Sequence, residues 1–354
     1  MTSLRKYLTH RLRSTMVLTL VLSILAVVVM ASTVSVFTWD VLYHYDANGN
    51  RLAEPQLVKK VQIEFFGFIA FILGAMCTVA PIVELGDMKN KRNADLIHSL
   101  PVSRSKMAIA HYVSGAFQIF AVYTAGYITM VLKVLTSENV RFIQHKEMLF
   151  VCYFALLGVG LGLYSIFMAV FNSANTVIDG CLFIGAWSIL PALFLIALGD
   201  FDGATGGAFG LSVLEKIFVS GEYLLPHSAL VVYDNFHSVL VGDEIFTRYA
   251  DAAVAWSVVG IICAAVYFYS FTKKRTEALG DVSGTAFGYK VLIPIGVFSM
   301  TQAFDEDIVS FIFAALLGVV GYMIYRRSFK IKKNDLITVG AIILCTGVMM
   351  AIVN

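Results

Sequence analysis

Long apolar segments are the feature that most constrains how this chain folds. A helix needs roughly 20 mostly apolar residues to cross the hydrocarbon core of a bilayer. Six segments clearly meet this criterion: residues 16–39, 63–83, 107–135, 149–171, 176–198 and 252–271. Within lipid, backbone polar groups must be satisfied inside each segment, and helices do this. The sequence therefore predicts an all-α polytopic membrane protein.

Three more apolar segments follow the first six, at residues 288–304, 308–325 and 336–353. The segment 288–304 is short and contains Pro294. It is therefore either a full span or one half of a re-entrant hairpin with the segment that follows. We expect a core of six spans and a C-terminal extension, residues 281–354, of up to three membrane segments.

The composition supports a membrane location and excludes other classes of protein. Apolar residues make up 58% of the chain and charged residues 14%, against about 45–50% and about 25% in soluble domains. The net charge of +2 excludes a strongly basic nucleic-acid binder, so we expect no nucleic-acid partner. The five cysteines all fall in predicted spans, where they act as apolar packing residues and suggest no disulfide framework and no metal site.

The distribution of basic residues predicts a cytoplasmic N-terminus, because short cytoplasmic loops carry most of the lysine and arginine in membrane proteins. With nine spans, this orientation puts most of the 26 basic residues inside, among them Lys274 and Lys332. The first apolar run is longer than the roughly 7–15 residues of a signal peptide, so we favour an uncleaved span. The chain would end outside, directly after a helix, as a portion of a longer protein would.

The N-terminal residues before the first span have the pattern of a short amphipathic helix. Its apolar face carries Leu4, Tyr7, Leu8 and Leu12. The remaining positions carry Arg5, Lys6, Arg11 and Arg13. Such a helix lies in the headgroup plane of the bilayer. The alternative is a basic segment that only fixes the orientation of the first span.

The inner loop between the second and third predicted spans, residues 84–106, is expected to hold a short helix over 93–101. Asn93 would cap its first turn, and Pro101 would stop it before the next span begins. Leu96, Ile97 and Leu100 give the helix an apolar edge. A short helix held between two long membrane helices can transmit force.

The same loop resembles a segment of the ABC-2 type transporter permeases. Its sequence Asp95-Leu-Ile-His-Ser-Leu-Pro-Val-Ser-Arg104, preceded by Glu84, is similar to the L-x-x-S-L-P-[VI]-[ST]-R segment of that family. The residues 273–280, after the sixth span, are similar to an R-x-E-x-x-G element. That element occurs in Gram-positive permeases such as the cell-wall-antibiotic-induced and acetoin-type systems. The resemblance covers roughly residues 1–280, the ABC-2-like core, and the extension departs from the six-span pattern.

The resemblance implies a permease subunit of an ABC exporter in the cytoplasmic membrane of a bacterium. A separate ATPase subunit would bind ATP and Mg²⁺, a second copy or a related permease would complete the path, and membrane lipids would surround it. The ATPase-coupling residues implied are Asn93, Asp95, Leu96, Ile97, His98, Leu100, Pro101 and Arg104. The implied interface helix is represented by Tyr7, Leu8 and Arg11.

Two other regions are candidates for the translocation path. Asp179, Trp187 and Pro191 lie in the fifth predicted span, where a kink and an aromatic side chain suit a permeation path. The outer segment 199–251 is too apolar for a free loop, and glycines break it into pieces that suit re-entrant or interfacial helices. This segment either caps the path, as in ABC-2 permeases, or packs on the outer leaflet.

Motifs for catalysis are missing from the sequence. An ATPase needs a Gly-x-x-x-x-Gly-Lys-Ser/Thr loop, and the nearest string, residues 284–290, has the wrong spacing. We therefore expect no enzyme activity and no cofactor in this chain itself. His227, Asp234 and His237 are close in sequence, but a metal site needs three or four converging ligands and the two histidines are not at i, i+4 spacing, so we expect no metal site there. Few acids fall inside the spans, Glu64 and Asp179 near their ends, which argues against an ion-coupled carrier. The alternatives to the permease are such a carrier and a non-transporting partner of a sensor or enzyme complex.

Overall fold

The computed structural model describes residues 2–45, 51–64, 68–142, 148–204, 246–274, 280–285, 287–302 and 308–353. This part of the chain is mostly helical. Six of its helices contain a stretch long and apolar enough to cross a membrane, in α1, α2, α4, α5, α9 and α11. Helices α6 and α10 contribute the shorter apolar stretches Val177–Leu190 and Tyr289–Thr301. The chain is a helical, multi-pass membrane protein.

Every apolar segment expected to cross the membrane contains a helix. The long helices are α1 (Thr2–Thr33), α2 (Phe68–Leu85), α4 (Arg104–Thr136), α5 (Met148–Ser173), α6 (Val177–Ala204), α9 (Phe246–Lys273), α10 (Tyr289–Gln302), α11 (Ile308–Arg326) and α12 (Lys333–Val353). Short elements connect them: β1 (Ser35–Tyr45), β2 (Arg51–Glu64), η1 (Asp87–Lys89), α3 (Lys91–His98) and η2 (Glu138–Phe142).

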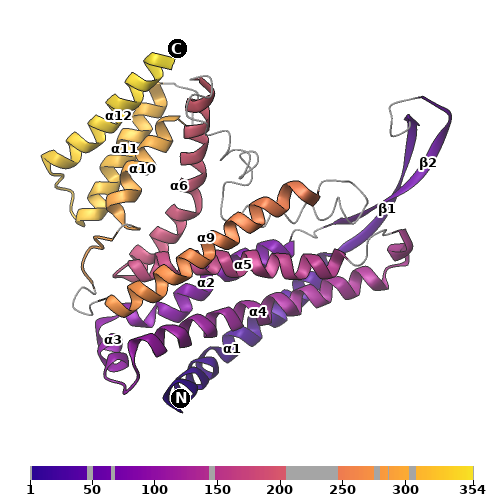
Figure 1. The fold of residues 1–354 in the computed structure, drawn as a ribbon, viewed down its shortest axis with the longest axis horizontal. Coiled ribbons are helices and arrows are strands. Elements are labelled where there is room, and N and C mark those ends of the chain that lie inside the picture. The colour runs from indigo at the N-terminus through magenta and orange to yellow at the C-terminus, as the bar shows by residue number, and fades with distance from the viewer. Residues whose placement is uncertain are drawn as a thin grey trace.

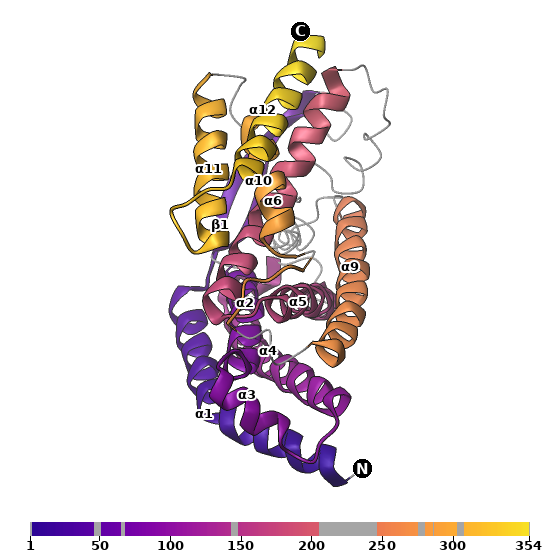
Figure 2. The same cartoon turned by 90° about the vertical axis from the view of Figure 1, so that its left-hand side faces the viewer.

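The helices form two groups that meet at α6. Helices α1, α2, α4, α5 and α9 pack on one another, whereas α10, α11 and α12 form a second group against α6. Figure 1 shows the first group across the lower part of the molecule and the second at the upper left. In Figure 2 the second group again lies above the first. Helix α6 also contacts α5 and α2, so it connects the predicted core to the C-terminal extension.

Helix α5 lies at the centre of the first group, because it is the most enclosed of the long apolar helices. Large aromatic side chains fill the space around it, including Tyr164, Phe167 and Phe171 on α5, Tyr123 on α4 and Tyr267 on α9, all fully buried. In contrast, the outward faces of α1, α4, α9 and α11 expose aliphatic and phenylalanine side chains. Such faces suit a bilayer, where lipid tails are as apolar as leucine.

A β-hairpin follows α1, where the sequence had predicted a continued helix. Strand β1 pairs antiparallel with β2, from Ser35 opposite Glu64 to Tyr45 opposite Arg51, and the hairpin extends away from the helices (Figure 1). The predicted first span therefore ends too late, at Trp39, and Glu64 closes a strand instead of lying inside span two. The β-branched and aromatic residues of this segment are apolar enough to resemble a span, yet they favour strands.

The N-terminal amphipathic helix is not a separate element. Helix α1 runs without a break from Thr2 to Thr33, because no proline or glycine interrupts it. Hydroxyl groups of Thr15, Thr19 and Ser23 donate hydrogen bonds to carbonyls one turn earlier in the same helix. The prediction of a short helix that stands apart from the first span is therefore wrong.

Several predicted features lie outside the described residues. These are most of the outer segment, at residues 205–245, and most of the R-x-E-x-x-G element, at residues 275–279. His227, Asp234 and His237 fall in the same undescribed part.

Candidate functional site

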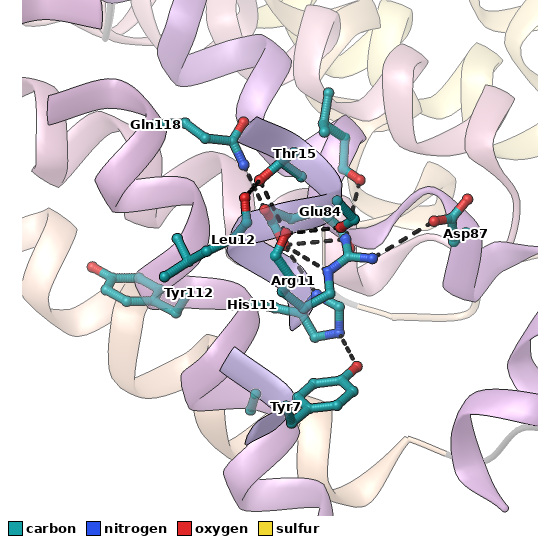
Figure 3. Close-up of polar contacts among 12 residues, drawn as sticks. Tyr7, Arg11, Leu12, Thr15, Glu84, Asp87, His111, Tyr112 and Gln118 are labelled. Carbon is teal, nitrogen blue, oxygen red and sulfur yellow. Dashed lines mark hydrogen bonds and ion pairs between the residues drawn. The ribbon is translucent and has the colours of Figure 1, made fainter. Parts of the chain in front are cut away.

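A buried polar network joins α1, α2 and α4 beside the loop that carries α3. Its centre is Glu84, in the last turn of α2, whose side chain has 0% exposure. Gln118 Nε2 donates to Glu84 Oε1 at 2.5 Å, and Arg11 donates to Oε2 from Nε at 3.4 Å and from NH2 at 3.2 Å. Figure 3 shows the three side chains converging from three different helices. The carboxylate is thus satisfied by donors distant in sequence.

His111 of α4 extends the network towards the start of α1. Its Nδ1 lies 3.2 Å from Glu84 Oε2, and its Nε2 is hydrogen-bonded to the hydroxyl of Tyr7 at 3.0 Å (Figure 3). His111 is fully buried and Tyr7 nearly so. The contacts form a continuous chain from Tyr7 through His111 to Glu84, of the kind that can hold or pass a proton.

Arg11 binds the C-terminal end of α2 as well as the carboxylate of Glu84. Its NH2 group donates to the backbone carbonyls of Val83 at 3.4 Å and Glu84 at 3.0 Å. Its NH1 group lies 3.7 Å from the carboxylate of Asp87 in η1. A cation at a helix C-terminus is favourable because it compensates the unpaired carbonyls there. Arg11 therefore ties α1 to the exact point where α2 gives way to the α3 loop.

Helix α3 presents two leucines outward. Leu96 is 64% exposed and Leu100, just beyond the helix, is 42% exposed. The opposite side faces the protein, because Ala94 is fully buried and Ile97 packs partly buried against the core. The predicted apolar edge is therefore divided, with Leu96 and Leu100 free and Ile97 used for attachment.

The boundaries of α3 differ from the predicted helix over 93–101. Asn90 is the N-cap, its side chain accepting from Arg92 N at 3.1 Å, and the helix ends at His98. Asn93 is therefore not the cap but lies inside the helix. The cap moved because Asn90, with extended backbone, directly follows η1. Asp95 is exposed, as is Pro101 in the bend after the helix, and the side chain of His98 lies outside the described residues.

Arg104, predicted as a contact for an ATPase, is engaged within this chain. Its NH1 group donates to the backbone carbonyl of Lys274, after the end of α9, at 2.7 Å. Arg104 begins α4, directly after its N-cap Ser103. It therefore fastens the far end of the α3 loop to α9.

Two lysines share the carbonyls at the C-terminal end of α5. Lys89 Nζ of η1 donates to Asn172 O at 3.2 Å, and Lys274 Nζ donates to the same oxygen at 2.5 Å. Both also donate to the carbonyl of Ala174. Burial lowers the pKa of Lys89 well below its usual range, and burial lowers the pKa of Lys274 to about 8. Because both Nζ groups bind the same two carbonyls, two positive charges lie close together, which favours loss of a proton from one of the lysines.

The lysine pair predicts an alkaline gain in stability. Unfolded lysine has a pKa of about 10.4, so between pH 8 and pH 10 the folded chain binds fewer protons than the unfolded chain. The free energy of unfolding then rises with pH across this window, by about 2 kcal/mol from Lys274. We expect thermal unfolding in detergent to show this rise, and Lys274→Met to lose the part of it that Lys274 contributes.

The neighbouring Lys273→Met variant is the matched control, because Lys273 is exposed. It should keep the pH dependence of the unmodified chain. An equal rise in the Lys274→Met variant would contradict the assignment.

The predicted path residues of α6 contact the C-terminal helices. Asp179 accepts hydrogen bonds from the hydroxyl of Tyr289 on α10 at 2.6 Å and from Arg327 NH2 at 3.1 Å. Trp187 Nε1 donates to the carbonyl of Phe287 at 3.0 Å. Pro191 lies within α6, and its side chain is outside the described residues. Asp179 and Trp187 thus attach α6 to the extension.

Sequence reasoning missed the network around Glu84 as a unit. Glu84, Tyr7 and Arg11 were recognised separately, but His111 and Gln118 were not. The available signal was their polarity within an apolar run and their seven-residue spacing, which places both on one face of α4. Their partners lie on other helices, so spacing within α4 shows the face but not the contacts.

Comparison with known proteins adds no family assignment. The chain matches no protein-family model, no curated protein and no solved structure. Among the described residues, His, Cys, Asp and Glu side chains form no group that could hold a metal ion. A functional assignment therefore depends on the loop motif and on the contacts around α3.

Proposed function

We propose that the chain is the permease subunit of an ABC exporter of the ABC-2 type. It would act as a dimer or with a related permease, and a separate ATPase subunit would bind ATP and Mg²⁺. The observation that carries the proposal is α3, a short helix between two membrane helices that exposes Leu96 and Leu100. Exposed leucines on a short connecting helix suit docking on another protein chain, because exposed apolar groups surrounded by polar residues are typical of protein-interaction sites.

The contacts around α3 support a coupling role. Movement of α3 displaces η1, and η1 is linked to α1 through Asp87 and Arg11 and to α5 through Lys89. Arg11 in turn contacts Glu84, which joins α2 to His111 of α4. A force applied to the exposed leucines is thus transmitted through polar contacts to α1, α2, α4 and α5. Transport requires that the ATPase bind one arrangement of these helices more tightly than another.

The test is purification of the chain from its native membrane in mild detergent, with mass spectrometry of the proteins that accompany it. We expect a polypeptide with a Gly-x-x-x-x-Gly-Lys-Ser/Thr loop. The double variant Leu96→Asp with Leu100→Asp should lose this partner, by tenfold or more, because charged groups replace the apolar docking surface. The variant should still insert and fold, since both side chains point outward.

Phe329→Asp provides the matched control. Phe329 is 90% exposed and lies between α11 and α12, on the same side as α3 in the nine-span topology. Its replacement should leave the partner bound. Retention of the ATPase by the double variant would contradict the role of α3, and purification without any such polypeptide would contradict the ABC assignment itself.

A proton-coupled carrier is the second candidate, and the chain Tyr7–His111–Glu84 is the observation that favours it. Buried acids and histidines in membrane helices often form proton relays. A carrier of this class would work without an ATPase, and His111→Gln would abolish uptake or efflux driven by a pH gradient in vesicles. Association with a histidine kinase or a synthase, without any flux, would favour the non-transporting alternative instead.

A further inference from the structure

A long apolar groove runs along the outer face of α1, where it meets α4. It encloses about 640 Å³, within the range of ligand pockets. Most of its lining comes from one stripe of α1, at spacings of three and four residues from Thr9 to Val27, and Phe117 and Ala121 of α4 form the other wall. Figure 1 shows the two helices running along each other. The groove therefore follows the length of a membrane helix.

The middle of the groove is apolar although hydroxyl groups line it. Thr19 donates to the carbonyl of Thr15 at 2.9 Å, and Ser23 donates to the carbonyl of Thr19 at 2.8 Å. Both hydroxyl protons are thus used within the helix, and the groove receives mainly methyl and methylene groups. Met16, Leu20 and Ile24 complete this stretch. A hydrocarbon chain fits such a lining, because a hydrocarbon has no group that needs a hydrogen bond.

One end of the groove carries a positive charge. Arg13 lines it there, and among the described residues no carboxylate forms an ion pair with Arg13. Arg5 and Lys6 are exposed about two turns earlier on α1 and lie outside the groove. An arginine near a helix end extends its guanidinium to the headgroup level while its stem lies along apolar surface.

We propose that this groove binds an anionic phospholipid, with one acyl chain along α1 and the phosphate on Arg13. The apolar length and the single cationic end complement the two parts of such a lipid. A second copy of the chain fits less well. Two copies inserted in the same orientation and related by a two-fold axis place equivalent residues at the same depth, so contact through this face brings like charges of Arg13 together.

Native mass spectrometry of the full chain in detergent tests the proposal, with phosphatidylglycerol and phosphatidylcholine added in equal amounts. We expect a one-lipid adduct that favours phosphatidylglycerol about fivefold, the size of one arginine acting on an anionic headgroup. Arg13→Gln should remove the preference, whereas Arg13→Lys should keep it. Ala121→Trp, which fills the groove, should remove the adducts of both lipids.

Matched controls lie on the same two helices. Arg5→Gln removes an exposed charge outside the groove, and Leu132→Trp places the same indole side chain at an exposed position of α4. Both should bind lipid as the unmodified chain does. An unchanged preference in Arg13→Gln, or unchanged adducts in Ala121→Trp, would overturn the proposal. Loss of a dimer in Ala121→Trp with lipid adducts intact would assign the face to contact between copies.

Discussion

Replacing Glu84 by Gln is expected to destabilise the folded chain by about 3–5 kcal/mol, the cost of leaving a buried ion pair with one partner. Gln keeps the size of the side chain but not its charge. Arg11 then stays buried opposite a neutral amide, and among the described residues it keeps one acidic partner, Asp87 at 3.7 Å. Thermal unfolding in a mild detergent, followed by circular dichroism, measures the effect.

Asp87→Asn is the matched control on the same arginine. The side chain of Asp87 is 61% exposed, so we expect a loss of less than about 1 kcal/mol. The double variant Arg11→Met with Glu84→Met should recover much of the stability, because apolar side chains of similar volume replace a buried pair at little cost. Equal effects of Glu84→Gln and Asp87→Asn would show that the network does not depend on a buried charge.

Gly260→Ala is expected to disrupt the contact between α5 and α9. A methyl group at Gly260 would lie 2.3 Å from Cα and 2.8 Å from O of Gly162. Both are backbone atoms, so a rotamer change cannot relieve the overlap and the helices must separate. Overpacking of this kind costs about 1–3 kcal/mol and occasionally more. We expect a value of at least about 3 kcal/mol, measured by thermal unfolding in detergent.

Gly158→Ala provides the comparison on α5. A methyl group there meets no atom within 4 Å, so the substitution should be neutral or stabilising by about 0.5–1 kcal/mol through helix propensity. If the two alanine variants unfolded at the same temperature, close backbone approach would not hold these helices together.

The glycines of α5 show that one residue type can have different roles within one helix. Gly158, Gly160 and Gly162 lie two positions apart along α5. In the structure Gly162 meets the backbone of α9 and Gly160 meets the side chain of Leu73, whereas Gly158 faces open space. Gly160 lies on the other side of α5 from Gly162, because two residues turn the helix by about 200°. Gly158 shares the face of Gly162 one turn earlier, where no atom lies close enough to meet a methyl group.

The network around Glu84 combines stability with the proposed coupling. Its members come from α1, α2 and α4, so its contacts hold the bundle beside the α3 loop. The same contacts would transmit a movement of α3, because the ion pair joins the helices rigidly. A variant such as Glu84→Gln should therefore affect both unfolding and any partner-dependent activity, whereas changes at Leu96 and Leu100 should affect only the latter.

The positions of the membrane helices were determined by the sequence alone. Each span is a local feature, since one apolar run of sufficient length in lipid satisfies its own backbone as a helix. All nine predicted segments contain a helix for this reason. The loop helix was also predicted, within a few residues of its ends. The hairpin was missed because Ser35–Tyr45 is apolar enough to extend a span, and its partner strand is not evident from local composition.

Only the tertiary structure decided which polar groups meet. Arg11 and Glu84 are 73 residues apart in the chain, and Asp179 and Arg327 are 148 apart. Hydropathy reports whether a residue suits lipid but not which helix lies beside it. The direction of Leu96 and Ile97 depends likewise on how α3 rests on the bundle. The sequence predicted an apolar edge on α3, and the packing of neighbouring helices determined which of its residues are exposed.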